Sequence, residues 1–159
     1  RETQAVAKIL AHELCRTSQR GALVFCLAGE LGAGKTTFVQ GFARALGIRD
    51  RITSSTFVLM KIYSLKHKQF QRLAHIDCYR VKSFRELACL GLDDILKDHR
   101  VIVLIEWADR IKKILPHDTV WIRFSHGAKQ NERRIIIGAG DTKASHDLVF
   151  SRGYARILL

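Results

Sequence analysis

A lysine and two threonines directly follow a glycine-rich loop, and this combination can hold phosphate groups. The sequence GELGAGKTTF runs from Gly29 to Phe38, and its spacing Gly29-x-x-x-x-Gly34-Lys35-Thr36 matches the phosphate-binding loop pattern. Glycines let the backbone curl so that successive N–H groups point at phosphate oxygens. A helix that begins near Lys35 directs the positive end of its dipole to the same point. The loop is therefore predicted to bind a nucleotide.

The role of each side chain in the loop follows from its chemistry. The Lys35 ammonium is expected to reach the β and γ phosphates, and the Thr36 hydroxyl is expected to ligate Mg²⁺. The alternative is a glycine-rich turn followed by a solvated lysine. An apolar strand before the loop and a helix after it favour the phosphate site. The predicted nucleotide-binding residues are Gly29, Glu30, Leu31, Gly32, Ala33, Gly34, Lys35, Thr36 and Thr37.

A magnesium ion bound with the nucleotide also requires a carboxylate at the end of a neighbouring strand. Glu106 ends the apolar run VIVLIE, and Asp77 lies in HIDCY, where alternation places His75, Asp77 and Tyr79 on one face. The alternatives are an ordinary acid at a strand end for Glu106 and an ion pair with a nearby base for Asp77. His75 by itself is typical of a hydrogen-bonded packing residue rather than a catalyst. Glu106 and Asp77 are therefore the two candidate acids.

An α/β arrangement of strands and helices is needed to bring these residues together. The apolar and amphipathic patterns predict a phosphate-loop (P-loop) NTPase-like domain, with parallel central strands extended by antiparallel hairpins and with helices on both faces. We assign residues 1–140 to this ATPase domain and 141–159 to a C-terminal tail of uncertain structure. Strands are expected at 22–28, 56–65, 72–81, 101–107, 119–126 and 132–140, and helices at 4–15, 35–46 and, with a break near Gly91, 83–99.

The composition of the chain indicates a globular protein with a strong positive charge. The 159 residues are 47% hydrophobic, and no apolar run approaches the roughly 18 residues of a membrane span. The four cysteines (Cys15, Cys26, Cys78 and Cys89) form no C-x-x-C pair, which favours buried, reduced thiols in a cytoplasmic protein. Lysine and arginine number 27 against 15 acids, a net charge of +12. This excess suits a polyanionic partner such as RNA, or else a solvated basic surface.

The ordered set of motifs resembles the TsaE (YjeE) family. These are small bacterial ATPases required to make threonylcarbamoyladenosine at position 37 of tRNAs that read ANN codons. The resemblance covers about residues 3–137, and beyond the phosphate loop it rests on SSTFVLMKIY, HIDCYRV, ELACLGLDDIL and VIVLIEWADRI. It implies ATP and Mg²⁺ as cofactors and the TsaD–TsaB transferase complex as partner, with tRNA contact through that complex and no membrane contact.

The resemblance also implies roles for particular residues. Lys35, Asp77 and Glu106 would be catalytic, Thr36 and Glu106 would hold the metal, and Trp107 would lie near the nucleotide. The family's usual S-P-T-F segment reads SSTF here, at 54–57, and its E-W-P-E reads EWAD. Loss of the proline removes a fixed φ and is expected to loosen this switch-like segment.

Two other functions are compatible with a phosphate loop. One is a small nucleoside or nucleotide kinase, although no arginine-rich lid is apparent in the sequence. The other is a binding module that holds ATP without turnover. The guanine-reading element N-K-x-D is absent from the sequence, which argues against a GTPase. We expect an ATPase that is weak without its partner proteins.

Overall fold

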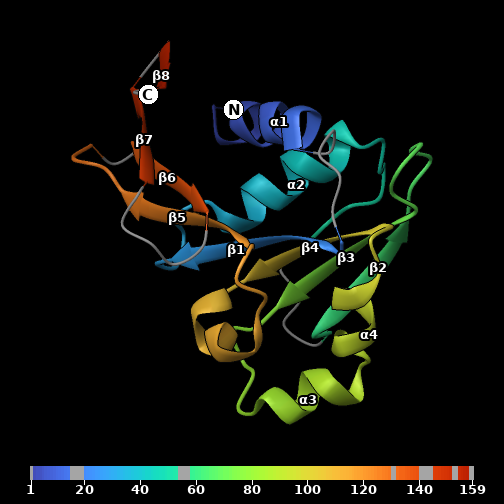
Figure 1. The fold of residues 1–159 in the computed structure, drawn as a ribbon. Coiled ribbons are helices and arrows are strands. Elements are labelled where there is room, and N and C mark those ends of the chain that lie inside the picture. Colours follow the sequence, from blue (N-terminus) through green and yellow to red (C-terminus); the bar gives the residue numbers. More distant parts are fainter. Residues whose placement is uncertain are drawn as a thin grey trace.

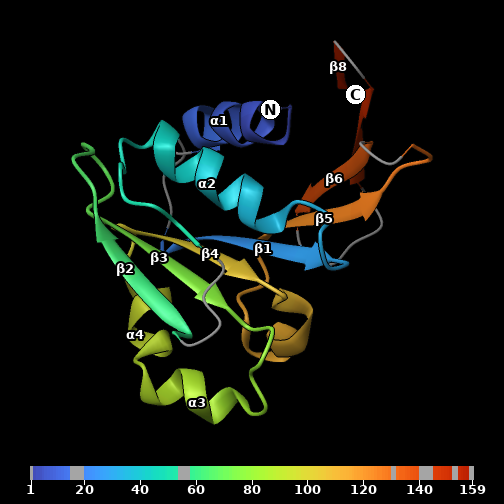
Figure 2. The ribbon, with the colours of Figure 1, turned by 180° about the vertical axis from the view of Figure 1, so that it is seen from behind.

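The apolar runs of the sequence assemble into one sheet. The computed structural model describes residues 2–14, 20–53, 58–129, 132–139, 145–151 and 154–157. Within these residues eight strands form the sheet, in the order β2-β3-β4-β1-β5-β6-β7-β8 (Figures 1 and 2). The strands are β1 (Leu23–Gly29), β2 (Met60–Ser64), β3 (Arg72–Asp77), β4 (Val101–Glu106), β5 (Val120–His126), β6 (Arg133–Ala139), β7 (Ser145–Ser151) and β8 (Tyr154–Ile157).

The centre of the sheet is parallel and its margins are antiparallel. Strand β1 pairs in parallel with β4 and β5, and β4 pairs in parallel with β3. On one margin β2 returns antiparallel to β3 as a hairpin, and on the other β6, β7 and β8 follow one another antiparallel. Continuous apolar runs such as VIVLIE suit strands that are covered on both faces. The predicted fold class is confirmed.

Helices cover both faces of the sheet. Helices α1 (Glu2–Leu14) and α2 (Lys35–Ala45) lie on one face, and α3 (Phe84–Cys89), α4 (Leu92–Lys97) and the 3₁₀ helix η1 (Ala108–Ile114) lie on the other (Figures 1 and 2). Alternate β1 side chains divide between the two cores: Phe25 packs edge-on to Phe42 of α2, with ring centroids 4.9 Å apart, while Cys26 faces the other core. Two apolar layers therefore hold the sheet between helices.

Two strands are shorter than the sequence pattern indicated. The expected strand at 72–81 ends at Asp77, because the Tyr79 N–H donates to Asp77 Oδ1 at 3.0 Å and the chain turns there. Tyr79 is therefore not on the same strand face as Asp77, contrary to the prediction. The expected strand at 56–65 begins only at Met60, and residues 54–57 lie outside the described part of the chain. Helix η1 was not anticipated.

The C-terminal region contains regular structure that the sequence did not reveal. Strands β7 and β8 both lie after residue 140, and β7 continues the sheet from β6 with Ile135 opposite Leu148. The boundary between a domain and a tail at residue 140 stays a prediction. No helix within the described ranges has the length and apolar character needed to cross a bilayer.

The cysteines agree only in part with the expectation of buried thiols. Cys26 and Cys78 are buried and reduced, and burial raises the pKa of each thiol to about 12. Cys89 is exposed, so the prediction was wrong for that residue. It lies in the last turn of the short helix α3, whose inner position is taken by Leu87. Cys15 lies outside the described residues.

Candidate nucleotide site

The connection between β1 and α2 has the backbone of a tight, glycine-dependent loop. Strand β1 ends at Gly29 and α2 begins at Lys35. The φ angles of Gly29 and Gly34 are 137° and 109°, a region that L side chains rarely adopt. A Cβ on Gly29 would also collide with the carbonyl oxygen of Phe124 in the neighbouring strand β5. Glycine is therefore required where β1 leaves the sheet.

Lys35 is buried against the loop and is not a solvated side chain. Only 5% of the residue is exposed. Its ammonium donates to the carbonyl oxygens of Gly29 at 2.7 Å and Glu30 at 2.8 Å, and it lies 3.7 Å from the ring centroid of Trp107. Burial lowers the pKa of Lys35, and the nearby carboxylates, Glu106 first among them, oppose that shift. Lys35 is therefore not the solvated lysine that the alternative interpretation expected.

The two candidate acids lie side by side at the carboxyl ends of adjacent parallel strands. Asp77 and Glu106 are directly paired in the register of β3 and β4. Side chains two residues apart share a face of a strand, and Leu73 and Leu104 both belong to the apolar core under α2. Asp77 and Glu106 therefore face the same side of the sheet, where α2 begins.

Glu106 connects a loop hydroxyl to a buried histidine. The Thr36 hydroxyl donates to Glu106 Oε2 at 2.7 Å, and His75 Nε2 lies 2.9 Å from Glu106 Oε1. The side chains of His75 and Glu106 are only 4% and 3% exposed. Each carboxylate oxygen thus has a partner, and the Glu106 side chain is fixed between the helix and β3.

The donor set at this point fits a magnesium ion bound together with a nucleotide. Mg²⁺ prefers hard oxygen ligands, and it is usually held by one or two carboxylates with substrate phosphates and water. Thr36 and Glu106 offer a hydroxyl and a carboxylate within 2.7 Å of each other. Among the described residues no group of three or more His, Cys, Asp or Glu side chains could hold a metal by itself. The nucleotide's phosphates would complete the shell.

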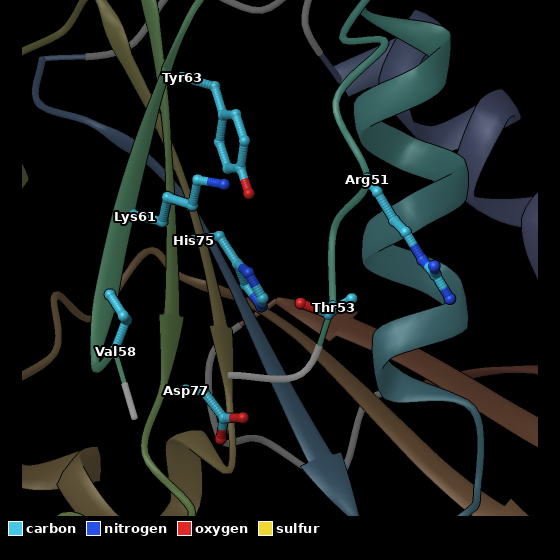
Figure 3. Close-up of a pocket in the computed structure, with 7 residues that line it drawn as sticks. All are labelled: Arg51, Thr53, Val58, Lys61, Tyr63, His75 and Asp77. Atoms are coloured by element: carbon cyan, nitrogen blue, oxygen red, sulfur yellow. The ribbon is translucent and has the colours of Figure 1, made fainter. Parts of the chain in front are cut away.

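A small cavity adjoins Asp77 and His75 on the side of β2. Its volume is about 140 Å³. Figure 3 shows His75 and Asp77 from β3, and Lys61 and Tyr63 from β2, beside this space, with Thr53 on the segment opposite. The full lining is Arg51, Thr53, Val58, Lys61, Tyr63, His75 and Asp77.

Trp107 has an unusual backbone conformation directly after β4. Its φ of 58° lies in the left-handed region, and no other non-glycine residue among those described has a positive φ. The indole ring packs against Tyr79, with centroids 5.0 Å apart, in addition to its contact with Lys35. Strained conformations of this kind concentrate at functional sites. The resemblance placed Trp107 near the nucleotide, and the structure places it against the loop lysine.

The sequence did not indicate two contacts that support the site. His75 is buried and hydrogen-bonded, as predicted for a hydrogen-bonded packing residue, but the sequence did not indicate that its partner is Glu106. At the end of β5, His126 Nε2 lies 3.2 Å from the carbonyl oxygen of Leu31 in the loop. The one feature that could have indicated this contact was the position of His126 at the end of a strand beside β1. The predicted switch segment, SSTF at 54–57, lies outside the described residues.

Comparison with known proteins agrees with this geometry. Residues 1–135 match the family model "Threonylcarbamoyl adenosine biosynthesis protein TsaE". The TsaE protein of Bacillus subtilis is 38% identical over 138 residues, which is 87% of this chain and 80% of the relative. That of Streptomyces coelicolor is 31% identical over 87% of this chain and 95% of the relative.

A solved structure supports the same relationship. The crystal structure of Bacillus subtilis YdiB superposes with a TM-score of 0.66 at 36% identity, and the match covers 87% of this chain and 79% of YdiB. The shared fold, the matched family model and the identity over most of the chain lead to one assignment. The chain belongs to the TsaE family, whose members act in tRNA threonylcarbamoyladenosine biosynthesis.

Proposed function

We propose that this protein binds ATP with Mg²⁺ at the Gly29–Thr37 loop and hydrolyses it as an accessory to the TsaD–TsaB transferase complex in the cytoplasm. The observation that carries the proposal is the hydrogen-bonded series Thr36–Glu106–His75 beside a buried loop lysine. Loop N–H groups and Lys35 would bind the phosphates, and Thr36 and Glu106 would hold the metal. A bound Mg²⁺ would neutralise charge on the β and γ phosphates.

Asp77 is the second acid in the proposed mechanism. It is 6% exposed and stands beside Glu106 at the strand ends, and it also lines the adjoining cavity. A carboxylate in this position would accept a proton from, or orient, the water that attacks the γ phosphate. His75 would keep Glu106 in its metal-binding orientation.

Partner dependence is supported by the surface around the loop. Leu31 at the tip of the loop is 72% exposed, and Tyr79, which packs on Trp107, is 44% exposed. Apolar side chains exposed next to a site favour coverage by another protein. We infer that the isolated chain hydrolyses ATP slowly and that TsaD–TsaB raises the rate, with tRNA reached through that complex.

Nucleoside phosphorylation is less compatible with the site. The cavity beside Asp77 has a volume of about 140 Å³. That volume is smaller than the roughly 300–1,000 Å³ usual for pockets that hold drug-sized ligands, which does not favour a nucleoside acceptor at this point. A panel of nucleosides added with ATP should therefore give no phosphorylated product.

Phosphate release by the purified chain tests the proposal. The rate is measured at saturating ATP and Mg²⁺, first alone and then with TsaD–TsaB. A several-fold increase with the complex is expected. ATP binding without any phosphate release, even with the complex, would instead identify a binding module. Fast release that the complex leaves unchanged would show that the site is complete in this chain.

A further inference from the structure

Half of the chain's net positive charge is concentrated in three short segments. Residues 44–51, 66–72 and 97–100 are 19 of 159 residues, and they hold eight lysines and arginines against two aspartates. These segments supply six of the twelve net positive charges. We name their eight exposed cations the basic edge: Arg44, Arg49, Arg51, Lys66, Lys68, Arg72, Lys97 and Arg100.

The fold brings the three segments to one end of the sheet. Arg72 opens β3, where the Gln71 N–H donates to the Arg100 carbonyl oxygen at 2.8 Å. Helix α2 runs back over the sheet, and Ile48 just after it shares an apolar core with Phe70 of the β2–β3 turn. Figures 1 and 2 show this turn, the end of α2 and the start of β4 at the same end of the sheet.

The β2–β3 turn presents its lysines from an ordered structure. His67 Nδ1 accepts the backbone N–H groups of Gln69 at 3.3 Å and Phe70 at 3.2 Å. The His67 ring also stacks on Phe70, which is fully buried, at a centroid distance of 5.6 Å. Lys66 and Lys68 on either side of His67 are exposed. The turn is therefore anchored to the core while its two ammonium groups face solvent.

Acidic groups neutralise only part of the basic edge. Asp98 accepts from the Arg100 backbone N–H and guanidinium and from Arg72, and these contacts hold the pKa of the Asp98 carboxyl well below its usual range. Arg49, Lys66 and Lys68 have no ion-pair partner among the described residues. A surface of this kind attracts a chain of phosphates, because each neutralised phosphate releases counterions.

Apart from Arg51, which also lines the cavity beside Asp77, the basic edge and the phosphate loop lie at opposite ends of the parallel strands. The loop follows the carboxyl end of β1, and the basic edge lies at the amino ends of β3 and β4. Six residues of β4 at about 3.3 Å each separate the two ends by roughly 20 Å. A polyanion held by the other seven cations therefore leaves the nucleotide site free.

We propose that the basic edge binds the phosphate backbone of tRNA directly. The TsaE family acts in the modification of tRNA, so tRNA is the polyanion that the charge pattern fits. Phosphate contacts of this type position an RNA without reading its sequence. The inference goes beyond the proposed function, because it requires neither ATP nor the TsaD–TsaB complex.

Fluorescence anisotropy with a labelled, unmodified tRNA transcript tests the proposal over a series of salt concentrations. The edge variant carries Arg49→Ala, Lys66→Ala and Lys68→Ala. The matched control carries Lys82→Ala, Lys113→Ala and Lys129→Ala, which removes the same charge from exposed lysines elsewhere. The edge variant should bind about tenfold more weakly at low salt, and its slope of log affinity against log salt should fall by about 2–3. The control variant should bind nearly as wild type does.

Three outcomes would overturn the proposal. Equal weakening of tRNA binding in the edge variant and the control variant would assign the attraction for tRNA to the overall charge of the protein. Unchanged tRNA binding by the edge variant would remove the basic edge from the interface. If the edge variant lost binding to phosphatidylserine vesicles but kept its tRNA binding, the basic edge would be assigned to membrane surfaces. Lys35→Ala separates the basic edge from the nucleotide site. This variant should keep its tRNA binding. Unchanged ATP affinity in the same variant would refute only the nucleotide site.

Discussion

The hydrogen bond between His75 and Glu106 provides the sharpest test of the site. His75→Leu places an apolar side chain of similar size on β3 and removes the ring nitrogen that lies 2.9 Å from Glu106 Oε1. Both side chains are less than 5% exposed, so water cannot readily replace the lost partner. Glu106 would then be held by Thr36 alone.

The expected effect on stability follows from that geometry. A hydrogen bond to a charged group contributes about 1.5–3 kcal/mol to stability, and His75→Leu removes one such bond. In a chain of this size each kcal/mol corresponds to about 2–4 °C in melting temperature, so a decrease of about 3–12 °C is expected. His75→Gln should recover part of this loss, because its amide N–H₂ group can still donate to the carboxylate.

The effect on function should appear in the metal dependence. Residues that orient a metal ligand typically change affinity or activity about 10–100-fold when they are replaced. We expect the Mg²⁺ concentration for half-maximal ATP hydrolysis, measured with TsaD–TsaB present, to rise by that factor in His75→Leu. ATP affinity in EDTA should change little, because the loop and Lys35 are intact.

Tyr63→Phe is the matched control, since Tyr63 lines the same cavity as His75. The hydrogen bonds of Glu106 described above go to Thr36 and His75 and not to Tyr63. This control should retain the wild-type Mg²⁺ dependence. A folded His75→Leu variant with unchanged Mg²⁺ dependence and unchanged hydrolysis would refute the assignment of His75 as the residue that positions Glu106. Equal effects of Tyr63→Phe and His75→Leu would attribute the change to the cavity as a whole.

Four further changes have defined outcomes. Lys35→Ala should weaken ATP binding at least tenfold by titration calorimetry, because a charge-assisted hydrogen bond contributes about 1.5–3 kcal/mol. Glu106→Gln should abolish most phosphate release while ATP affinity in EDTA stays near wild type, since shape is kept and charge is lost. Gly41→Ala should lower stability to urea by about 1–3 kcal/mol, because its Cβ would lie 2.7 Å from the α1 backbone. Iodoacetamide at pH 8 should label exposed Cys89 but not Cys26, whose pKa near 12 keeps the thiol protonated until the pH approaches that value; peptide mapping distinguishes the sites.

Much of the fold could be predicted because its signals are local. Apolar runs located the central strands, and Gly91, with a φ of 77°, marked the break between α3 and α4 as expected. The ends of β3 and the start of η1 depend instead on hydrogen bonds that form only in the folded chain, such as that from the Tyr79 N–H to Asp77. Strands β7 and β8 lie within residues 141–159, whose mixed character gave no usable alternation signal.

The site could be predicted to the level of its loop and its two acids. Parallel strands bring their carboxyl ends to one edge, so the positions of Asp77 and Glu106 followed from the strand pattern. The role of His75 could not be predicted, because its bond to Glu106 joins residues 31 positions apart and depends on the register of β3 and β4. Likewise the basic edge was visible in the sequence only as a dispersed excess of charge, because three separate segments form it.

Lys35 is the residue through which a bound nucleotide would act on the surface of the protein. Its ammonium is shared between the carbonyl oxygens of Gly29 and Glu30 and the face of Trp107. A phosphate that recruits Lys35 must compete with these partners, so the indole would lose a cation as the phosphate gains one. Trp107 is held in a left-handed backbone conformation and packs on Tyr79, which is 44% exposed. A nucleotide that drew Lys35 away from Trp107 would therefore alter a contact that leads directly to the exposed ring of Tyr79, and a partner protein that covered Tyr79 would act on the same chain of contacts.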